Sequence, residues 1–510
     1  MRTRFVIVIL LLTLALGFLP AVHGAMDEKK DDVTIYETAL WGNPAAAESL
    51  EVTTLTHMDQ RLFWKTTFRP GSGAPAETEF TYSPERKTTR GDYDNSQMQV
   101  SFAEANYGIG GSMTMEELES EEYITMYMGS DSLGKLWTPM VDVARRTPAG
   151  ETYSEDVRVA DYYDYYPMRV NLYFDSSHMD EYIYFNETKK ANDLLTKFFA
   201  VEIPEKAMLN VTIRKDGYGT VQELDCRYSD SIENEELGWL YGQDLGIHTA
   251  LTMDGGYIIL SREKDDPSNS YETVLNSPRL REDYGIYYFP LAEYVPENVV
   301  YVDGRNPERV ADMERLGNVF PLGDDVNAVN LYYHKDADQL ILITEESRHI
   351  WATIIDRTSM TELQKIDLGA IDEREYVDNV LVQGELLLVS VMEPYSEEKP
   401  QRENRLVMLK EEDGSWTVEL QTPISWPDQG RYVQFDPYWQ AKFLWDGQRL
   451  AIAQYENYWS SCDVYVLICT EGELEYGGKY QRRDTNGGVY DYNRMIQPVN
   501  DGQGLEIFWE

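Results

Sequence analysis

Apolar residues recur along most of the chain in short runs, either alternating with polar residues or following one another without interruption. The clearest runs begin at a turn dipeptide: Asp446-Gly447 precedes an apolar stretch that ends at Ile452. Residues 254–260, 336–342 and 501–507 have a similar shape. Asp-Gly readily adopts the positive φ angles of a tight turn, and a period of two residues is typical of a strand. Each copy therefore predicts a turn followed by a buried strand.

Two stretches of the chain contain four such strands in succession, separated by short polar turns. The first predicts strands at residues 328–333, 339–344, 349–355 and 362–368, and the second at residues 377–382, 385–391, 405–410 and 416–421. Four antiparallel strands form one blade of a β-propeller, and blades bury their two faces by stacking on one another. The pattern thus predicts repeated four-stranded sheets.

These repeats resemble those of β-propeller proteins in general, and no particular family is recognised. The Gly-His and Trp-Asp signatures of one major propeller class are absent. We predict an all-β fold in which residues 25–510 form one β-propeller of seven or eight four-stranded antiparallel blades, with short helical insertions. The expected blade centres are Leu62, Ile124, Tyr182, Ile258, Leu340, Leu386, Leu450 and Leu505. A pair of β-sandwich domains and a mixed α+β array are the alternatives.

The two ends of the chain suggest how the last blade is completed. Residues 494–498 and 505–509 predict its inner strands, and no outer strands follow before Glu510. Residues 33–37 form a lone strand-like segment near the start of the chain. We expect this N-terminal strand to pair with the last blade and close the ring, because an unpaired edge there would recruit other chains.

Three segments carry helix signals. An Asn-Pro start predicts a helix over residues 307–316. Thr114 and Glu117 have the spacing of a capping box, and residues 192–199 are a third candidate. We expect these helices to decorate the loops of the blades.

The N-terminus has the composition of a secretory signal. Arg2 and Arg4 precede an apolar run over residues 5–19, which is shorter than the roughly 20 residues that span a bilayer. Small residues just before Ala25 suit signal peptidase. We therefore expect residues 1–24 to be removed, the mature chain to be secreted or to lie in the cell envelope, and no membrane insertion afterwards. An uncleaved N-terminal membrane anchor is the alternative.

The chain is strongly acidic. Its 89 Asp and Glu residues outnumber 45 Lys and Arg residues, and the formal net charge is −44. Such a field repels phosphate groups, so nucleic acids and anionic membranes are poor partners, whereas divalent cations or basic partners are favoured. The charge is spread along the chain, and 42% of the residues are hydrophobic, so we expect a folded core.

The motifs of several common enzyme and metal-binding classes are absent. The sequence has no His-Glu-x-x-His, no Cys-x-x-Cys, no phosphate-binding Gly-x-x-x-x-Gly-Lys-Ser/Thr and no Gly-x-Ser-x-Gly. Three cysteines, Cys226, Cys462 and Cys469, are too few for a disulfide framework. We expect buried structural thiols, with a disulfide from Cys226 to one of the others as the alternative.

Calcium is the one cofactor that the sequence suggests. Asp92, Asp94, Asp484 and Asn486 offer oxygen ligands in Gly-containing turns, which suit a hard cation. None has the full spacing of an EF-hand, and Asp, Asn and Gly are also ordinary turn residues. A calcium site and plain turn chemistry are therefore both open, and otherwise no cofactor is expected.

Aromatic residues suggest where a ligand binds. The chain has 37 Tyr and 11 Trp, and several cluster beside carboxylates. Exposed Tyr and Trp can stack on sugar rings or anchor a protein partner, whereas Tyr in strands also packs between blades. The candidate ligand-binding residues are Tyr162, Tyr163, Tyr455, Tyr458, Trp459, Tyr490 and Tyr492.

Together these features favour an extracytoplasmic binding or scaffold propeller whose ligand is a glycan or a protein. The alternative is a glycan-active hydrolase or lyase that uses carboxylates in the central channel. A subunit for assembly or sensing in an envelope complex is a third possibility. No catalytic residue can be assigned, because 89 acidic residues offer many pairs and the sequence does not place them in space.

Overall fold

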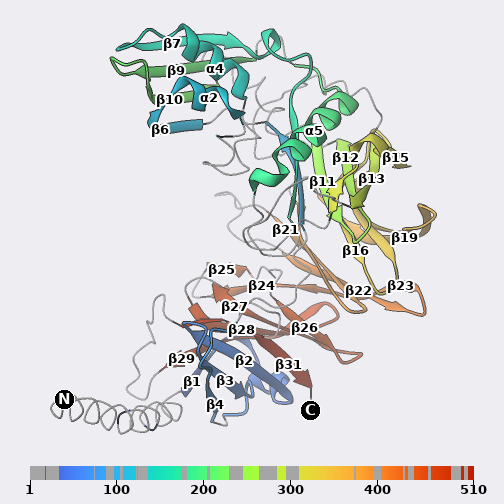
Figure 1. The fold of residues 1–510 in the computed structure, drawn as a ribbon. Helices are drawn as coiled ribbons and strands as arrows, with labels where there is room; N and C mark the ends of the chain where they lie inside the picture. The colour runs from blue at the N-terminus through green and yellow to red at the C-terminus, as the bar shows by residue number, and fades with distance from the viewer. Residues whose placement is uncertain are drawn as a thin grey trace, which may run out of the picture. The chain divides into compact units, whose positions relative to one another are not determined.

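Strands dominate the chain (Figure 1). The computed structural model describes residues 34–73, 75–87, 97–103, 107–121, 136–173, 181–203, 207–228, 245–262, 284–293, 309–372, 375–393, 404–428, 431–434, 441–457, 461–483, 496–498 and 504–509, together with residues 18, 24 and 123. The chain divides into two compact units, one formed by residues 1–93 and 375–510 and the other by residues 94–374. Antiparallel sheets of four or five strands account for most of both units.

In its described residues, the first unit contains three such sheets. One joins β2 (Leu50–Met58), β3 (Leu62–Phe68) and β4 (Glu77–Tyr82) to the C-terminal β30 (Ile496–Pro498) and β31 (Leu505–Trp509). The second consists of β20 (Tyr376–Gln383), β21 (Leu386–Met392), β22 (Arg405–Glu412) and β23 (Ser415–Pro423). The third consists of β26 (Lys442–Trp445), β27 (Leu450–Asn457), β28 (Ser461–Thr470), β29 (Glu473–Arg483) and β1 (Thr34–Gly42). A hairpin of β24 (Ser425–Asp428) and β25 (Arg431–Gln434) lies in the same unit.

The third sheet is buried on both faces, because alternate residues of its strands enter two different cores. Leu450 and Ile452 of β27 share one core with Leu388 of the second sheet. Ala451, between them, shares another core with Val52 of the first sheet. Successive side chains of a strand point to opposite faces, so the apolar run of β27 serves two neighbours at once. The three sheets therefore stack face to face, as blades do.

Two sheets of the second unit follow the same plan. β11 (Leu245–Leu251), β12 (Gly255–Arg262), β13 (Gly285–Glu293) and β15 (Gly317–Pro321) form one, with β14 (Arg309–Ala311) paired to another part of β13. β16 (Asn327–His334), β17 (Gln339–Glu346), β18 (His349–Asp356) and β19 (Thr361–Ala370) form the other. Tyr257 shares a core with Leu340, whereas its neighbour Ile258 enters a separate core. These sheets are therefore stacked as well.

The rest of the second unit departs from the blade pattern. β6 (Tyr107–Met113), β10 (Val221–Tyr228), β9 (Met208–Lys215) and β7 (Thr152–Arg158) form a sheet in that order, and β5 (Gln97–Phe102) pairs with β8 (Met168–Tyr173). α4 (Trp137–Arg146) packs on the sheet, α2 (Met115–Glu119) packs on α4, and α5 (Glu181–Phe199) packs on β8. Their buried residues belong to one core.

The predicted fold class is confirmed: the protein is nearly all-β and is built from four-stranded antiparallel sheets. β16 to β19 and β20 to β23 are the two predicted sets of four strands. The expected turn geometry is also present, since Gly447 has a φ of 97° and Asp338, in the predicted turn at residues 336–338, has a φ of 52°. In the residues that the structure describes, five sheets have the blade pattern, against the seven or eight expected.

Six of the eight expected blade centres lie in strands of these sheets, and one was wrong. Tyr182 lies in α5 rather than in a strand. Further along the same helix, Ala191, Leu195 and Phe199 are buried at a spacing of four residues, which fits one face of a helix and not a strand. Ile124 lies outside the described residues.

The helix predictions had different outcomes. Thr114 caps α2 as predicted: its hydroxyl accepts the Glu117 amide at 3.2 Å, and the Glu117 carboxylate accepts the Thr114 amide at 2.8 Å. α5 includes the predicted segment 192–199. The predicted helix over residues 307–316 was wrong. Pairing of β14 with β13 leaves room for only one 3-10 turn, Met313–Arg315, before β15.

The two ends of the chain both pair within the first unit, but not with each other. Residues 33–37 were expected to join the strands of residues 494–509; instead β1 pairs with β29, and β31 pairs with β2. The burial patterns explain the difference. Leu505 and Ile507 of β31 enter the core, whereas most residues of β1 are exposed, as suits an outer edge strand. Closure of a complete ring stays a prediction.

Two of the cysteines are buried free thiols. Cys226 and Cys469 are both fully buried, and burial raises the pKa of each to about 12. The alternative of a disulfide from Cys226 is therefore wrong. Among the described residues, no helix combines the length and apolar character that a membrane crossing requires. The predicted signal, residues 1–24, lies outside the description except for Phe18 and Gly24.

Candidate binding pocket

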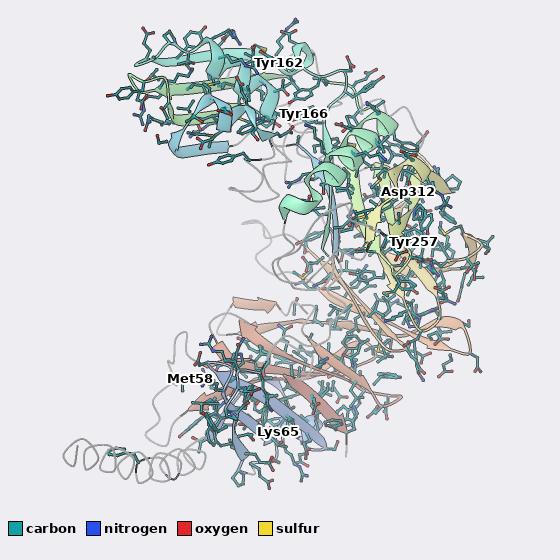
Figure 2. The ribbon with its side chains drawn as sticks, viewed as in Figure 1. Met58, Lys65, Tyr162, Tyr166, Tyr257 and Asp312 are labelled. Atoms are coloured by element: carbon teal, nitrogen blue, oxygen red, sulfur yellow. The ribbon has the colours of Figure 1, made fainter. Side chains whose placement is uncertain are left out.

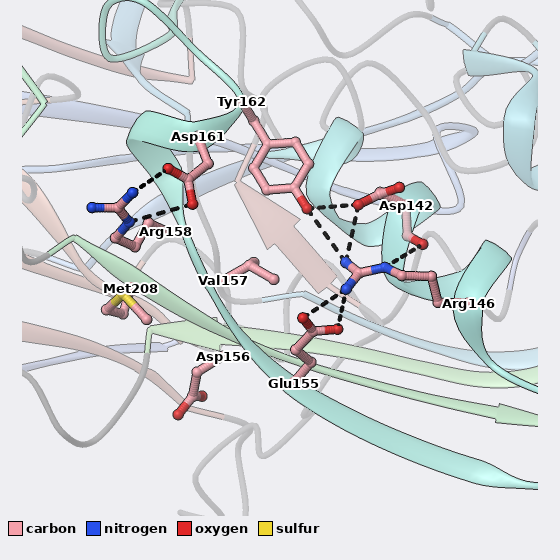
Figure 3. Close-up of a pocket in the computed structure, with 9 residues that line it drawn as sticks. All are labelled: Asp142, Arg146, Glu155, Asp156, Val157, Arg158, Asp161, Tyr162 and Met208. Atoms are coloured by element: carbon pink, nitrogen blue, oxygen red, sulfur yellow. Dashed lines mark hydrogen bonds and ion pairs between the residues drawn. The ribbon is translucent and has the colours of Figure 1, made fainter.

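A pocket of about 630 Å³ lies in the second unit, where α4 meets the edge strand β7 (Figure 3). This volume is within the usual range for small-ligand sites. Most of its lining comes from α4, β7 and the 3-10 turn Val159–Asp161 that follows β7. The lining residues are Asp142, Arg146, Glu155, Asp156, Val157, Arg158, Asp161, Tyr162 and Met208.

The local sequence explains why charged groups meet here. α4 is amphipathic: Met140, Val143 and Ala144 are buried, and Asp142 and Arg146 are exposed one turn apart. β7 is the last strand of its sheet, so only Val157 of its seven residues is fully buried. Glu155 therefore meets the helix residues Asp142 and Arg146 on one face of the strand, and Asp156 and Arg158 lie on the other face.

Arg146 is the centre of the polar network. Its Nη1 donates to both carboxylate oxygens of Glu155 at 2.5 and 2.6 Å, and its Nη2 donates to Asp142 at 3.0 Å. The Tyr162 hydroxyl donates to the same Asp142 oxygen at 2.8 Å. One guanidinium thus fixes two carboxylates and, through Asp142, a phenol.

The network also sets the protonation of its members. The pKa of Arg146 is raised, mainly because Glu155 accepts its hydrogen bonds. Burial, helped by the bond to Asp142, raises the pKa of Tyr162 to about 12. Near neutral pH, Arg146 is therefore a permanent cation and Tyr162 a permanent hydrogen-bond donor.

A second ion pair lies on the other side of the pocket. Arg158 donates to both oxygens of Asp161 at 2.6 and 3.3 Å. Asp156 accepts a hydrogen bond at 2.8 Å from the side-chain amide of Asn210 on β9. With four carboxylates (Asp142, Glu155, Asp156, Asp161) and two guanidiniums (Arg146, Arg158), the lining carries a formal charge of −2.

The structure places the sequence-predicted residues in different surroundings. Tyr162 lines the pocket, whereas Tyr163 does not. The Tyr163 oxygen accepts the Thr138 amide at 3.3 Å, and burial raises the pKa of Tyr163 to about 12. Tyr166, four residues after Tyr162, is a core residue, and Figure 2 labels both. Tyr455 is buried in the first unit and donates to the Gly504 carbonyl at 2.6 Å.

The other candidates lie outside the described residues, namely Tyr458, Trp459, Tyr490, Tyr492, Asp92, Asp94, Asp484 and Asn486. The part of the chain that the structure describes contains no group of three or more His, Cys, Asp or Glu side chains able to hold a metal ion. Sequence reasoning missed Asp142, Arg146 and Glu155. The spacing of Asp142 and Arg146 was a usable signal, because charges four residues apart favour a helix face.

A second ionic cluster ties together three turns of the second unit. Arg357, after β18, donates to both oxygens of Asp254 at 2.8 Å and also bonds Asp338. Tyr333 donates to Asp338 at 3.0 Å and lies 5.7 Å from the guanidinium. Hydrogen bonding to Asp338 raises the pKa of Arg357 above its usual range. We interpret this cluster as structural, because it joins hairpins of two stacked sheets.

Strand pairing and stacking define the class of protein: nearly all-β, with sheets of the propeller-blade type beside an α+β part. No protein-family model and no curated protein sequence matches the chain.

Solved structures give distant likenesses. A putative 6-phosphogluconolactonase from Bacteroides fragilis is 8% identical, with a TM-score of 0.28 over 85% of this chain and 98% of that one. Another, from Bacteroides uniformis, is 12% identical, with a TM-score of 0.27 over 88% and 99%. A subtype N10 neuraminidase-like protein of A/little yellow-shouldered bat/Guatemala is 11% identical, with a TM-score of 0.21 over 47% and 57%. The fold assignment rests on strand pairing and not on these likenesses.

Proposed function

We propose that the chain is an exported binding or scaffold protein that uses the pocket to hold a glycan or protein ligand without transforming it. The observation that carries this proposal is the bonded set of Asp142, Arg146, Glu155 and Tyr162. Such groups are fixed before a ligand arrives, so less conformational entropy is lost on binding.

The same groups are poorly suited to catalysis. Arg146 is bonded to Asp142 and Glu155, and Arg158 is bonded to Asp161, so three of the four lining carboxylates are engaged in ion pairs. Tyr162, with a pKa of about 12, is a weak acid at neutral pH. The lining residues include no His, Cys or Ser, so a base or nucleophile here would have to be a carboxylate. A glycosidase needs two such carboxylates, whereas among the lining carboxylates only Asp156 is not bonded to a guanidinium. The pocket therefore supports binding better than the hydrolase or lyase alternative.

The test compares two adjacent arginines of α4. Arg146 holds the pocket network, whereas Arg145 pairs with Glu119 at 2.8 Å and does not line the pocket. Arg146→Gln and Arg145→Gln remove the same charge from neighbouring helix positions. The purified chain and both variants are screened against a glycan array and a panel of peptides, and assayed for turnover of aryl glycosides and lactones.

We expect the wild type and Arg145→Gln to bind the same ligand and Arg146→Gln to bind it at least about 10-fold more weakly, which corresponds to about 1.4 kcal/mol. No turnover is expected. Turnover that Arg146→Gln abolishes would identify an enzyme instead. Equal binding by both variants would mean that the ligand lies elsewhere.

A further inference from the structure

The charge of the pocket bears on the kind of ligand it takes. Asp142 and Glu155 share Arg146, and Asp161 is bonded by Arg158. Asp156 also lines the pocket, and its hydrogen-bond donor is the neutral side-chain amide of Asn210. Among the described residues, no guanidinium or ammonium group pairs with Asp156. The pocket therefore has an uncompensated negative charge in a chain whose net charge is already −44.

The position of the pocket on the sheet points to an extended ligand. In the pairing of β7 with β9, the Val159 amide donates to the Ala207 carbonyl, and the Lys215 amide donates to the Glu151 carbonyl, both at 2.9 Å. Odd-numbered residues of β7 therefore direct their backbone groups toward β9. Even-numbered residues, including Asp156, direct theirs away from β9, toward the edge that β7 presents as the last strand of its sheet.

We propose that the pocket binds a lysine or arginine side chain from a basic, extended segment of a partner protein lying along β7. This proposal rests on the proposed function and names the ligand class of the same site. The ammonium or guanidinium group would lie beside Asp156, on the face of β7 that also carries Arg158, the partner of Asp161. Met208, which pairs with Arg158 and so lies on the same face as Asp156, would contact the aliphatic stem of the side chain.

The charge of Asp156 and the backbone edge of β7 both favour a basic, extended peptide as the ligand. A neutral glycan would not neutralise the negative charge of Asp156. An extended peptide can add its backbone hydrogen bonds to an open sheet edge, while its alternate side chains reach the pocket. Opposite charge on partner and chain also speeds their encounter, an effect that salt screens over about 8 Å at 0.15 M.

The experiment uses a matched pair of variants in the full chain. Asp156→Asn removes the proposed partner of the cation while leaving an oxygen that can accept the Asn210 amide. Asp225→Asn makes the same charge change on β10 of the same sheet, where Asp225 pairs with Arg227 at 3.0 Å outside the pocket. Hexalysine, hexaglutamate and neutral cellohexaose are titrated into each protein by calorimetry at about 20 and 150 mM NaCl.

We expect hexalysine to bind the wild type, more tightly at low salt, and hexaglutamate not to bind. Asp156→Asn weakens hexalysine at least about 10-fold, and Asp225→Asn changes it less than about 2-fold. Equal weakening by the two variants would overturn the proposal, because the peptide would then sense only the overall charge. Cellohexaose binding that Asp156→Asn abolishes, without hexalysine binding, would overturn it and leave the proposed binding function intact. Turnover of glycosides with no binding of any probe would overturn both.

Discussion

The C-terminal strand offers the sharpest test of the fold. Ile507 of β31 is 8% exposed and pairs with Val52 of β2, in a core shared with the third sheet of the first unit. Its neighbour Phe508 is 51% exposed. We compare Ile507→Ala with Phe508→Ala, which truncate adjacent side chains on opposite faces of one strand.

The expected magnitudes follow from burial. Truncating a buried Ile to Ala costs about 2 to 5 kcal/mol, the sum of lost transfer free energy and the cavity left behind. Because β31 is short, we expect the lower end, about 2 kcal/mol. Phe508 has the larger side chain but keeps half of it in water, so its truncation should cost less than about 1 kcal/mol.

The assay is amide hydrogen exchange at Leu55, whose N–H donates to the Gly504 carbonyl at 2.8 Å and so reports on this edge of β2. A loss of about 2 kcal/mol speeds exchange about 30-fold when opening is at equilibrium. Ile507→Ala should show that acceleration, and Phe508→Ala no more than about 5-fold. If Phe508→Ala has the larger effect, or if neither variant changes the rate, then β31 does not pair with β2 as described.

Three further predictions concern other parts of the structure. Deleting residues 26–42 removes β1, exposes the edge of β29 and breaks the bond from Tyr476 to Glu37 (2.8 Å), so we expect aggregation by light scattering; a monodisperse product with an unchanged melting temperature would contradict this. Burial lowers the pKa of His248, although a hydrogen bond to the Ala328 backbone opposes this shift. As pH falls, the imidazole is therefore protonated at a higher pH in the unfolded chain than in the folded one. The resulting stability is present above about pH 6.5 and is lost as pH falls through the lowered pKa; His248→Gln should flatten this slope in melts from pH 7.5 to 5, and an identical slope would refute the assignment. Gly255→Ala would bring a Cβ within 2.6 Å of the Phe289 carbonyl oxygen and should cost about 1 to 3 kcal/mol, whereas Gly217→Ala meets nothing within 4 Å and should be nearly neutral in the same melts.

The alternation of apolar and polar residues predicted the four-stranded sheets well where each strand pairs with the next strand in the sequence. Residues 328–368 alternate turn dipeptides with apolar runs, and the resulting sheet pairs neighbours in sequence order. Such local hairpins need no information beyond turn chemistry and a period of two. The capping box at Thr114 was also predictable, since it is a contact between residues three apart.

The pairing of the chain ends and the position of the pocket were not predicted, because both depend on contacts between distant parts of the chain. The sequence contains β1 and β31 but does not choose between β2 and β29 as their partners, because that choice depends on which core receives Leu505. The pocket was missed except for Tyr162, because it brings α4 together with β7 and α4 itself was not predicted. Clusters of aromatic residues in the sequence identify side chains that could contact a ligand. Whether such a side chain is exposed depends on how the chain packs, and Tyr455 is buried in the core.

The pairing of both chain ends within the first unit has a consequence for synthesis. Glu37 and Tyr476 are bonded across 439 positions of the chain, so this unit cannot be completed until synthesis has passed Tyr476. At 5 to 20 residues per second, the first strands wait roughly 20 to 90 s for their partners. The second unit, residues 94–374, has all of its own strands by then. An order of events follows in which residues 94–374 can fold first, while β1 stays without its partner strand until β29 has been made.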